Sequence, residues 1–329
     1  MEKNKNFSKG NITFVSRKTD ELSSEEMGQL IKLYNETMND QRTEKEFKAK
    51  YLYNFLGFSF HGLMKLGERI IGCYTVIPYE FVFFSKQVSI GQWCETLIHK
   101  DFRGSFSNFK KLGDTVNEDL KKSKIFFIYV LPNRQIYVVS KRLLGMKDIG
   151  KLSYYVYPNN LKKFFIKFYP FNILFGLFLK FLTKIKPRSN HKYKFSIYKI
   201  CNEKFNYSRY GENQEYKFFS DKNYKLVYKI ENSKKYDNAK IIWIIDVFPL
   251  TEINLENSVN KLKSLNEDVD LIVYIGNLEK IPKNLFKVPE NFLKRQSTFT
   301  GKILDSKQIQ ETAFEMSNWN INLSNFDHK

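Results

Sequence analysis

The sequence LIHKDFRGSFSNFKKLG, residues 97–113, decides the fold of this chain because it joins a β-rich run to a helix. Apolar residues recur from its second half onward at helical spacing, at Phe109, Leu112, Val116 and Leu120. The turn before this helix is short and basic, and it contains Gly104. A strand that enters a helix through such a turn points several free backbone N–H groups at one spot, and the helix dipole adds positive potential there. The stretch therefore predicts an anion-binding site at the start of the helix.

The chain before this turn is predicted to form two helices and then antiparallel strands. The helices are expected from Ser23 to Tyr34 and over residues 44–53. Four strands are expected to follow, at residues 58–66, 69–77, 80–84 and 87–98. Only Gly67 and Glu68 separate the first two strands, and this spacing is typical of a hairpin.

An unbroken apolar run, residues 125–131, follows the helix that starts after the turn. A run this short predicts a central strand that is covered on both faces. A helix over residues 134–144, ended by Gly145, and a strand over residues 152–157 are expected next. The order of a helix, antiparallel strands and then alternating strands and helices predicts an α/β (α+β) fold. Its sheet should be mixed, largely antiparallel and flanked by helices.

The second half of the chain repeats the order of strand, helix and strand, without the basic glycine turn. Its strands are predicted at residues 195–201, 216–219, 224–230, 241–247 and 271–275, and its helix at residues 255–265. This order predicts a second, smaller and degenerate copy of the first unit. The expected organisation is a first domain over residues 1–157, a connecting segment over residues 158–193 and a second domain over residues 194–329.

The composition is that of a folded protein with an excess of positive charge. Of the 329 residues, 42% are hydrophobic and 16% aromatic, which excludes wholesale disorder. The net charge of +19 favours anionic partners, although a coding bias towards Lys, Asn, Ile, Phe and Tyr would produce the same excess. We expect no nucleic-acid partner, because the chain shows no helix-turn-helix, zinc-finger or RNP-like motif.

Cysteine and histidine usage indicates a reducing compartment and no metal. The three cysteines, Cys73, Cys94 and Cys201, are widely spaced and form no CxxC pair, so neither a disulfide framework nor a zinc site is expected. The four histidines form no ligand motif, and we therefore expect no metal cofactor. Residues 1–11 are polar and lack the apolar core of a secretory signal, which favours a cytoplasmic location.

Basic and aromatic residues alternate in the connecting region, and residues 151–194 contain no Asp or Glu. Three interpretations of its core, residues 161–186, stay open. It is a packed helix between domains, an amphipathic segment on an anionic membrane face, or a spanning helix. The spanning helix is least favoured, because Lys167, Pro170 and Lys180 interrupt the apolar run. The second interpretation would place the chain peripherally on the inner face of the cell membrane.

An ordered set of motifs resembles a known superfamily. It consists of HKDFRG (99–104), an amphipathic helix, an apolar strand, Pro132-Asn133, and a helix that ends in LGM (144–146). This set resembles the GNAT acetyltransferase superfamily over residues 25–157. More narrowly, it resembles the tandem GNAT-like acyltransferases associated with bacterial surface-polysaccharide assembly. The tail, residues 318–327, also resembles the way such chains end.

The resemblance implies that acetyl-CoA or another acyl-CoA binds at the basic turn, through backbone N–H groups that hold its pyrophosphate. The expected donor-binding residues are Ile98, Arg103, Gly104, Ser105, Ser107, Asn108 and Asn133. Asn133 also suits the cap of the following helix. The family's second turn glycine is absent, and Phe106 or Asn108 stands in its place, which restricts close approach of the backbone to a phosphate. Either the extra residue of this turn re-forms the cradle, or donor binding is weakened.

Acyl transfer to an amine needs a base, a polarised carbonyl and a stabilised leaving thiolate. Glu95, in the strand before the turn, is the candidate base, and its alternative is an ordinary strand carboxylate. Tyr137 is the candidate acid that protonates the thiolate, as the resemblance implies, and its alternative is core packing. His99 suits either role, a phosphate contact or a purely structural role.

These features predict an acyl-CoA-dependent N-acyltransferase. The expected acceptor is an amino sugar, nucleotide- or lipid-linked, in surface-polysaccharide biosynthesis, bound between the two domains. The alternative is a non-catalytic GNAT-like binding or scaffold protein peripheral to the membrane. The pairing of residues 92–98 with residues 125–131 distinguishes the two, because a pantetheine arm needs these strands to separate above the Arg103 turn.

Overall fold

The computed structural model describes residues 11–160, 163, 191–211, 215–293 and 297–326. The chain forms two compact units, and each is discontinuous in sequence. Unit 1 comprises Met1–Asp148, Lys199–Gly211 and Phe299–Phe314. Unit 2 comprises Ile149–Tyr198, Glu212–Thr298 and Glu315–Lys329.

The strands of unit 1 form a mixed sheet in the order β1-β2-β3-β4-β5-β13. They are β1 (Ile12–Lys18), β2 (Phe60–Leu66), β3 (Arg69–Phe83), β4 (Lys86–Ile98), β5 (Ile125–Val130) and β13 (Ser297–Ile303). All neighbours are antiparallel except β4 and β5, which are parallel and are connected through a helix. The predicted mixed, largely antiparallel sheet is thus confirmed.

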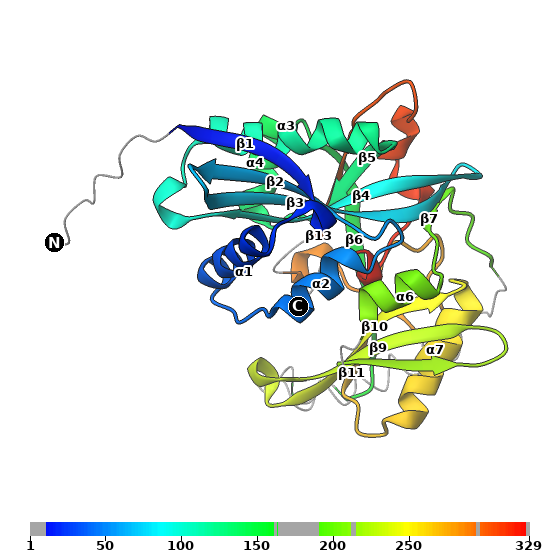
Figure 1. Ribbon diagram of the computed structural model, residues 1–329. Coiled ribbons are helices and arrows are strands. Elements are labelled where there is room, and N and C mark those ends of the chain that lie inside the picture. The colour runs from blue at the N-terminus through cyan, green and yellow to red at the C-terminus, as the bar shows by residue number, and fades with distance from the viewer. Residues whose placement is uncertain (1–10, 161–162, 164–190, 212–214, 294–296, 327–329) are drawn as a thin grey trace. The chain divides into compact units, whose positions relative to one another are not determined.

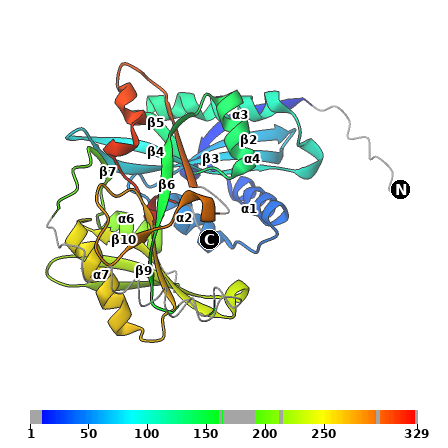
Figure 2. The ribbon, with the colours of Figure 1, turned by 180° about the vertical axis from the view of Figure 1, so that it is seen from behind.

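Helices cover both faces of this sheet, as Figures 1 and 2 show. They are α1 (Ser24–Met38), α2 (Glu44–Leu52), α3 (Phe106–Lys122) and α4 (Arg134–Leu144), with α6 (Glu203–Tyr210) near the end of α2. The four apolar positions of α3 that were predicted to face the core are all buried. Capping boxes start α1 and α2: the Ser23 hydroxyl accepts from the Glu26 amide, and the Thr43 hydroxyl accepts from the Glu46 amide.

One strand prediction was wrong. Residues 80–84 were expected to form a separate strand, whereas β3 continues through Pro78 as far as Phe83. Proline is tolerated here because β2 ends at Phe60, which pairs with Val76, so that Pro78 lies beyond the end of β2. On its other side Pro78 pairs with Gly91 of β4.

The strands of unit 2 form a sheet in the order β6-β11-β10-β9-β8. They are β6 (Lys147–Pro158), β8 (Tyr216–Ser220), β9 (Lys225–Ser233), β10 (Ala239–Phe248) and β11 (Leu271–Gly276), with the short β12 (Phe286–Lys287) on β6. Two further short strands, β7 (Ile197–Lys199) and β14 (Trp319–Asn320), pair with each other. Strands β10 and β11 are parallel and are connected through α7 (Glu252–Leu265), whose Leu255, Val259 and Leu262 are fully buried.

Each unit is completed by a strand from the other half of the sequence. Strand β13, from the end of the chain, pairs with β5 through Thr300–Ile303, and β6 pairs with β11. The predicted domains were continuous, over residues 1–157 and 194–329, whereas both compact units are discontinuous. The connecting segment, residues 158–193, lies mostly outside the described residues. The assignment of the second domain as a degenerate copy stays a prediction.

Candidate functional site

Strand β4 separates from β5 in the middle of the unit 1 sheet. The two strands pair from Ser89 to Gln92 of β4, where Gln92 lies opposite Tyr129. Beyond this point, β4 continues to Ile98 and pairs with β3, while β5 continues to Val130 and pairs with β13. The edge of β4 from Trp93 to Ile98 therefore has no strand partner on its β5 side among the described residues.

A β-bulge lies where the separation begins. On β3, Thr75 pairs with Glu95 and the next residue, Val76, pairs with Trp93, so Cys94 is an extra residue of β4. Bulges bend a strand and increase its twist, which helps to turn β4 away from β5. Adjacent residues on β3 point to opposite faces, so the bulge also places Trp93 and Glu95 on opposite faces of the sheet.

The predicted anion-binding turn lies at the end of this unpaired stretch. Arg103 donates from Nε to the carbonyl oxygen of Ile98 at 2.9 Å, which fixes the turn to the strand. Gly104 has φ +94°, and the position of an added Cβ would be in open space. The hydroxyl of Ser105 caps α3 by accepting from the Asn108 amide at 3.3 Å. The amides of Phe106 and Ser107 come before Phe109, whose amide donates the first intrahelical hydrogen bond to the Ser105 carbonyl, so they have no acceptor within the helix.

The residue types of the turn suit a phosphate despite the missing second glycine. The first turn of α3 contains no acidic residue, so nothing in it opposes the helix dipole. Phe106 is 65% exposed, and most of its ring therefore faces solvent. The Asn108 amide is already used by Ser105, which leaves the earlier amides as the donors for an anion.

Solved structures of similar fold match this arrangement over most of the chain. A GCN5-related N-acetyltransferase from Anabaena variabilis has a TM-score of 0.59 and 11% identity, covering 90% of this chain and 73% of that chain. The chain has the GNAT fold. A probable N-acyltransferase from Enterococcus faecalis has a TM-score of 0.59 and 13% identity, covering 89% and 73% of the respective chains. A GCN5-related N-acetyltransferase from Kribbella flavida has a TM-score of 0.56 and 10% identity, covering 89% of this chain and 72% of that chain. No protein-family model and no curated protein matches the sequence.

In this GNAT fold, the candidate base Glu95 is the centre of a buried ionic network. Both guanidinium nitrogens of Arg42 donate to its carboxylate, at 2.7 and 3.1 Å. Lys50 donates from Nζ at 2.7 Å and Tyr51 from its hydroxyl at 2.5 Å. The Arg42 guanidinium also lies 3.3 Å from the centre of the Tyr34 ring.

This network decides the charge of Glu95. Burial alone would raise the pKa of its carboxyl group, but the neighbouring Lys50 and Arg42 lower the pKa to about 2. A carboxylate that is held so firmly in its ionised form is a weak proton acceptor at neutral pH. The role of Glu95 as a base stays a prediction, and Arg42, Lys50 and Tyr51 were not found by sequence reasoning.

His99 lies at the other end of the unpaired edge, beside the turn. Arg69 contacts its Nε2 at 3.2 Å, and the Asp101 carboxylate lies 3.6 Å from its Nδ1. The Asp101 backbone amide donates to Nδ1 at 3.4 Å, so donors face both ring nitrogens of His99. This side chain is 14% exposed.

Tyr137 and Asn133 are tied to local partners. The Tyr137 hydroxyl donates to Asp148 at 3.1 Å and accepts from Lys141 at 3.3 Å. Asn133 caps α4 by accepting from the Ile136 amide at 3.0 Å, as expected of a helix cap. The three candidate catalytic residues Glu95, His99 and Tyr137 thus have separate sets of partners within unit 1.

A buried histidine lies on the same face of the sheet as Glu95. His61 is 1% exposed, and its two ring nitrogens contact the hydroxyls of Thr19 at 2.8 Å and Thr75 at 3.1 Å. Burial lowers the pKa of His61 to about 4, so the imidazole is neutral at pH 7. These neutral contacts indicate a structural role.

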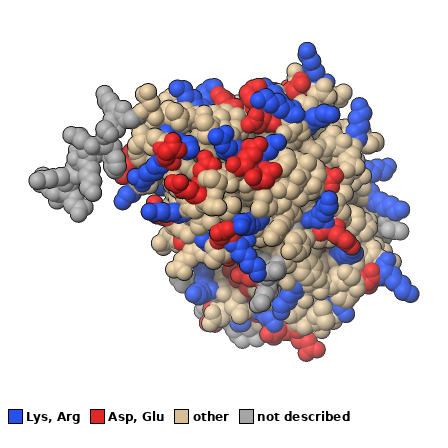
Figure 3. All heavy atoms as spheres, in the orientation of Figure 1, with Lys and Arg blue, Asp and Glu red and all other residues tan. Residues whose placement is uncertain are grey.

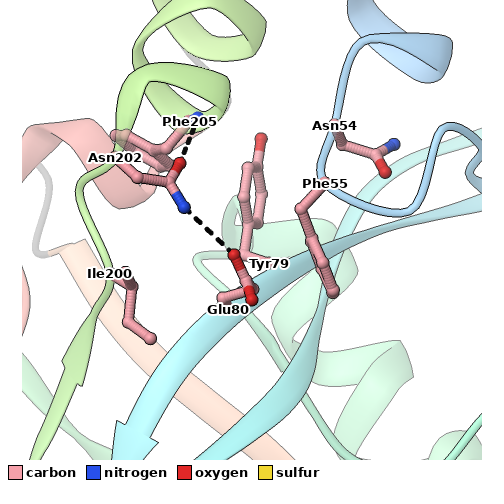
Figure 4. Close-up of a pocket in the computed structure, with 7 residues that line it drawn as sticks. All are labelled: Asn54, Phe55, Tyr79, Glu80, Ile200, Asn202 and Phe205. Atoms are coloured by element: carbon pink, nitrogen blue, oxygen red, sulfur yellow. Dashed lines mark hydrogen bonds between the residues drawn. The ribbon is translucent and has the colours of Figure 1, made fainter.

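A small pocket lies between the end of α2, β3 and α6, and the space in it that a water-sized molecule can occupy is about 10 Å³. Its lining residues are Asn54, Phe55, Tyr79, Glu80, Ile200, Asn202 and Phe205 (Figure 4). The Glu80 carboxylate accepts from the amide groups of Gln87 at 2.7 Å and Asn202 at 3.1 Å. Asn202 also caps α6 through the Phe205 amide, so Glu80 connects β3 to the start of that helix. The pocket thus combines aromatic rings with one carboxylate.

The described residues give few signs of other ligand classes. Among them, no group of three His, Cys, Asp or Glu side chains is arranged to hold a metal ion. In the described part of the chain, no helix is both long and apolar enough to cross a bilayer. The basic aromatic core, residues 161–186, lies outside the described residues except for Lys163. On the face shown in Figure 3, basic and acidic side chains are interspersed rather than gathered in one basic patch.

Proposed function

We propose that this chain is an acyl-CoA-dependent N-acyltransferase that uses unit 1 as its donor site. The observation that carries the proposal is the separation of β4 from β5 above the Arg103–Gly104 turn. The backbone of β4 from Glu95 to Leu97, which has no strand partner on its β5 side among the described residues, offers hydrogen bonds to an extended, amide-containing chain such as pantetheine. The turn at the end of this edge offers amides and a helix dipole to a pyrophosphate.

The proposed reaction is a direct transfer without a covalent enzyme intermediate. The acceptor nitrogen attacks the thioester carbonyl carbon, a C–N bond forms and the C–S bond breaks. The proton lost by nitrogen balances the proton gained by the leaving thiolate, so the products are an amide and free CoA. Unit 1 would contribute orientation of the donor along β4 and exclusion of water.

The side chains would divide these tasks. We propose that the Glu95 network fixes the bulge and therefore the course of the donor, while Glu95 serves as base only through water. His99 would contact the donor near the turn. Tyr137 stays the proposed acid for the thiolate, and a Tyr137→Phe variant should then lower kcat by about 10²-fold at unchanged donor affinity.

For the acceptor we keep an amino sugar, nucleotide- or lipid-linked. In this proposal, hydroxyl groups of the acceptor contact the Glu80 carboxylate and the aromatic side chains at the rim of this small pocket. Along β3, Glu80 lies five residues from Thr75, the partner of Glu95, or about 16 Å at about 3.3 Å per residue. An acceptor of that length would reach from this pocket to the bulge. None of the three described cysteines forms a disulfide with another, in keeping with the proposed cytoplasmic location.

Calorimetric titration of the full chain with acetyl-CoA tests the donor site. We expect binding with a Kd in the micromolar range, lost in Gly104→Trp and retained in Gly67→Trp. Both glycines have positive φ and open space at the Cβ position, so the second variant controls for backbone strain. Absence of binding to the unaltered chain at millimolar ligand contradicts the proposal.

A non-catalytic GNAT-fold binding protein is the second candidate, and the low pKa of Glu95 favours it. That candidate predicts acetyl-CoA binding without release of free CoA when amino-sugar acceptors are added. Under it, residues 161–186 would bind an anionic membrane face. Sedimentation with phosphatidylserine vesicles, with and without Lys→Gln changes in that segment, tests the membrane contact separately from catalysis.

A further inference from the structure

The parallel strands of unit 2 separate in the same way as those of unit 1. Strands β10 and β11 pair from Ile241 to Ile244, and Ile244 lies opposite Tyr274. Past this point β10 pairs only with β9, and Ile245 is an extra residue between Ile244 and Asp246, as Cys94 is in β4. A buried carboxylate follows the bulge in each unit: Asp246 is 6% exposed.

In unit 2, the C-terminal segment of the chain lies where the strands separate. At the end of β11, the Asn277 amide donates to the Ile321 carbonyl at 3.0 Å, and Gly276 forms an antiparallel bridge with Asn322. The Asn322 side chain reaches the other strand, since its amide donates to the Asp246 carboxylate at 2.9 Å. One residue, Asn322, thus connects the two strands that have separated.

The fit of this segment is close. Every residue from Ile321 to Phe326 is buried. A Cβ added to Gly276 would lie 2.7 Å from the Ile321 carbonyl oxygen, so only glycine permits this approach. The Asn277 side chain also donates to the carbonyl oxygens of Met316 and Trp319, at 2.8 and 3.1 Å. These bonds hold the start of the segment.

We infer that the C-terminal segment, residues 319–326, is the permanent occupant of the gap between β10 and β11, and that unit 2 takes no acyl donor. The segment forms main-chain hydrogen bonds with the end of β11, at Gly276 and Asn277, and a side-chain hydrogen bond with Asp246 of β10. The start of α7 agrees with this inference, because Glu252 in its first turn opposes an anion. The chain therefore has one donor site, a statement that rests on the proposed function of unit 1.

Exchanging the amide of Asn322 and the carboxylate of Asp246 tests, without any ligand, whether residues 319–326 occupy the gap. In Asn322→Asp, two carboxylates face each other, and amide hydrogen exchange of Asn277 and residues 321–326 should accelerate at least tenfold. Adding Asp246→Asn restores a carboxylate–amide pair, with the amide now at position 246 and the carboxylate at position 322. It should return most of the protection against amide hydrogen exchange. Asn320→Ala, two residues away, is the matched control and should change exchange less than twofold. Protection that is unchanged in Asn322→Asp, or no better in the double variant, overturns the inference.

Calorimetry of the full chain tests the number of donor sites. We expect one acetyl-CoA per chain, and the same number in Asn322→Ala. Two equivalents in the unaltered chain overturn the inference and leave the proposed function standing. No binding at all removes the proposed function and the one-donor statement, while the exchange experiment still decides whether residues 319–326 occupy the gap.

Discussion

Helices α3 and α7 lie at equivalent places in their units, between two parallel strands, yet their first turns have opposite electrostatic character. The first turn of α3 has no acidic residue. Helix α7 begins at Glu252, whose side chain is 3% exposed and lies 3.8 Å from Lys280. A carboxylate in the first turn compensates the helix dipole, so α3 favours an anion and α7 does not. The frame of strand, helix and strand does not make an anion site by itself, because the residues of the turn decide it.

The two bulges differ in the same way. Glu95 is held by two cations and a tyrosine hydroxyl, whereas Asp246 accepts from the neutral amide of Asn322. A buried carboxylate must be compensated in either unit. Unit 1 achieves this with charged residues of α2 and of the loop before it, and unit 2 with the C-terminal segment.

Removing Arg42 is expected to have the largest effect on stability. Arg42→Met leaves the Glu95 carboxylate buried without its bidentate partner, which should cost about 3–5 kcal/mol of unfolding free energy. Asn322→Ala removes a neutral donor from Asp246 and should cost about 1–3 kcal/mol. Urea denaturation followed by circular dichroism measures both losses.

The control for this comparison is Lys48→Met. It opens an exposed pair with Glu44, in which the side chains are 41% and 63% exposed, and should cost less than about 0.5 kcal/mol. If Arg42→Met destabilises the chain no more than this control, the ionic network does not hold Glu95.

Acid should unfold unit 1 before unit 2. The folded-state pKa of His61 is about 4, below the usual pKa of 6.5 for histidine, so the unfolded chain binds more protons than the folded chain between these values. The stabilisation that the neutral His61 gives to the folded state is complete above pH 6.5. As the pH falls to 4, it is lost, which lowers the free energy of unfolding by about 3 kcal/mol. For Glu95, the corresponding window runs from pH 4.5 down to about 2.

Tryptophan fluorescence separates the units in this experiment. Trp93 reports on unit 1, and Trp319, which is fully buried, reports on unit 2. In single-tryptophan variants, the Trp93 signal should change at the higher pH. If the two signals changed at the same pH, the neutral His61 would not limit the stability of unit 1. The His61→Gln variant should abolish the pH dependence of the stability of unit 1 between pH 6.5 and 4.

Gly104→Val should weaken donor binding by about 100-fold, or about 2.7 kcal/mol. A β-branched residue at φ +94° is strained and displaces the first amides of α3. Gly67→Val, also at positive φ (+59°) but in the hairpin turn of β2 and β3, is the control for a strained substitution outside the turn. Fluorescence titration with acetyl-CoA measures both variants, and equal weakening would remove the turn from the donor site.

The smallest expected effect concerns the acceptor. Glu80→Gln keeps the shape of the pocket but removes its charge, and should raise KM for an amino-sugar acceptor by about tenfold while the donor Kd is unchanged. Steady-state kinetics with saturating acetyl-CoA and varied acceptor measure this KM. A changed kcat with an unchanged KM would place the acceptor elsewhere in unit 1.

Local sequence patterns predicted much of the fold. The apolar spacing of α3, the unbroken run of β5 and the caps of α1 and α2 are short-range signals, and the corresponding elements are confirmed. The capping role of Asn133 came from the same kind of signal. The class of the sheet also followed from the order of its elements.

Long-range pairings were not visible in the sequence. Arg42 and Glu95 are 53 residues apart, and an arginine in a loop between helices carries no periodic signal. The bulge at Cys94 depends on how β3 and β4 align, so the orientation of Glu95 could not be derived from strand alternation. The exchange of β6 and β13 between the units was missed for the same reason, since it joins residues far apart in sequence.

That exchange has a consequence for how the chain is made. Unit 1 includes Phe299–Phe314, so an emerging polypeptide cannot complete its first sheet until these residues have been synthesised. Until then the edge of β5 that pairs with Thr300–Ile303 stays open, and an open edge of this kind is prone to aggregation. Contacts of such high sequence separation also slow folding. Nascent chains that stop before residue 297 should therefore depend on chaperones far more than the finished protein does.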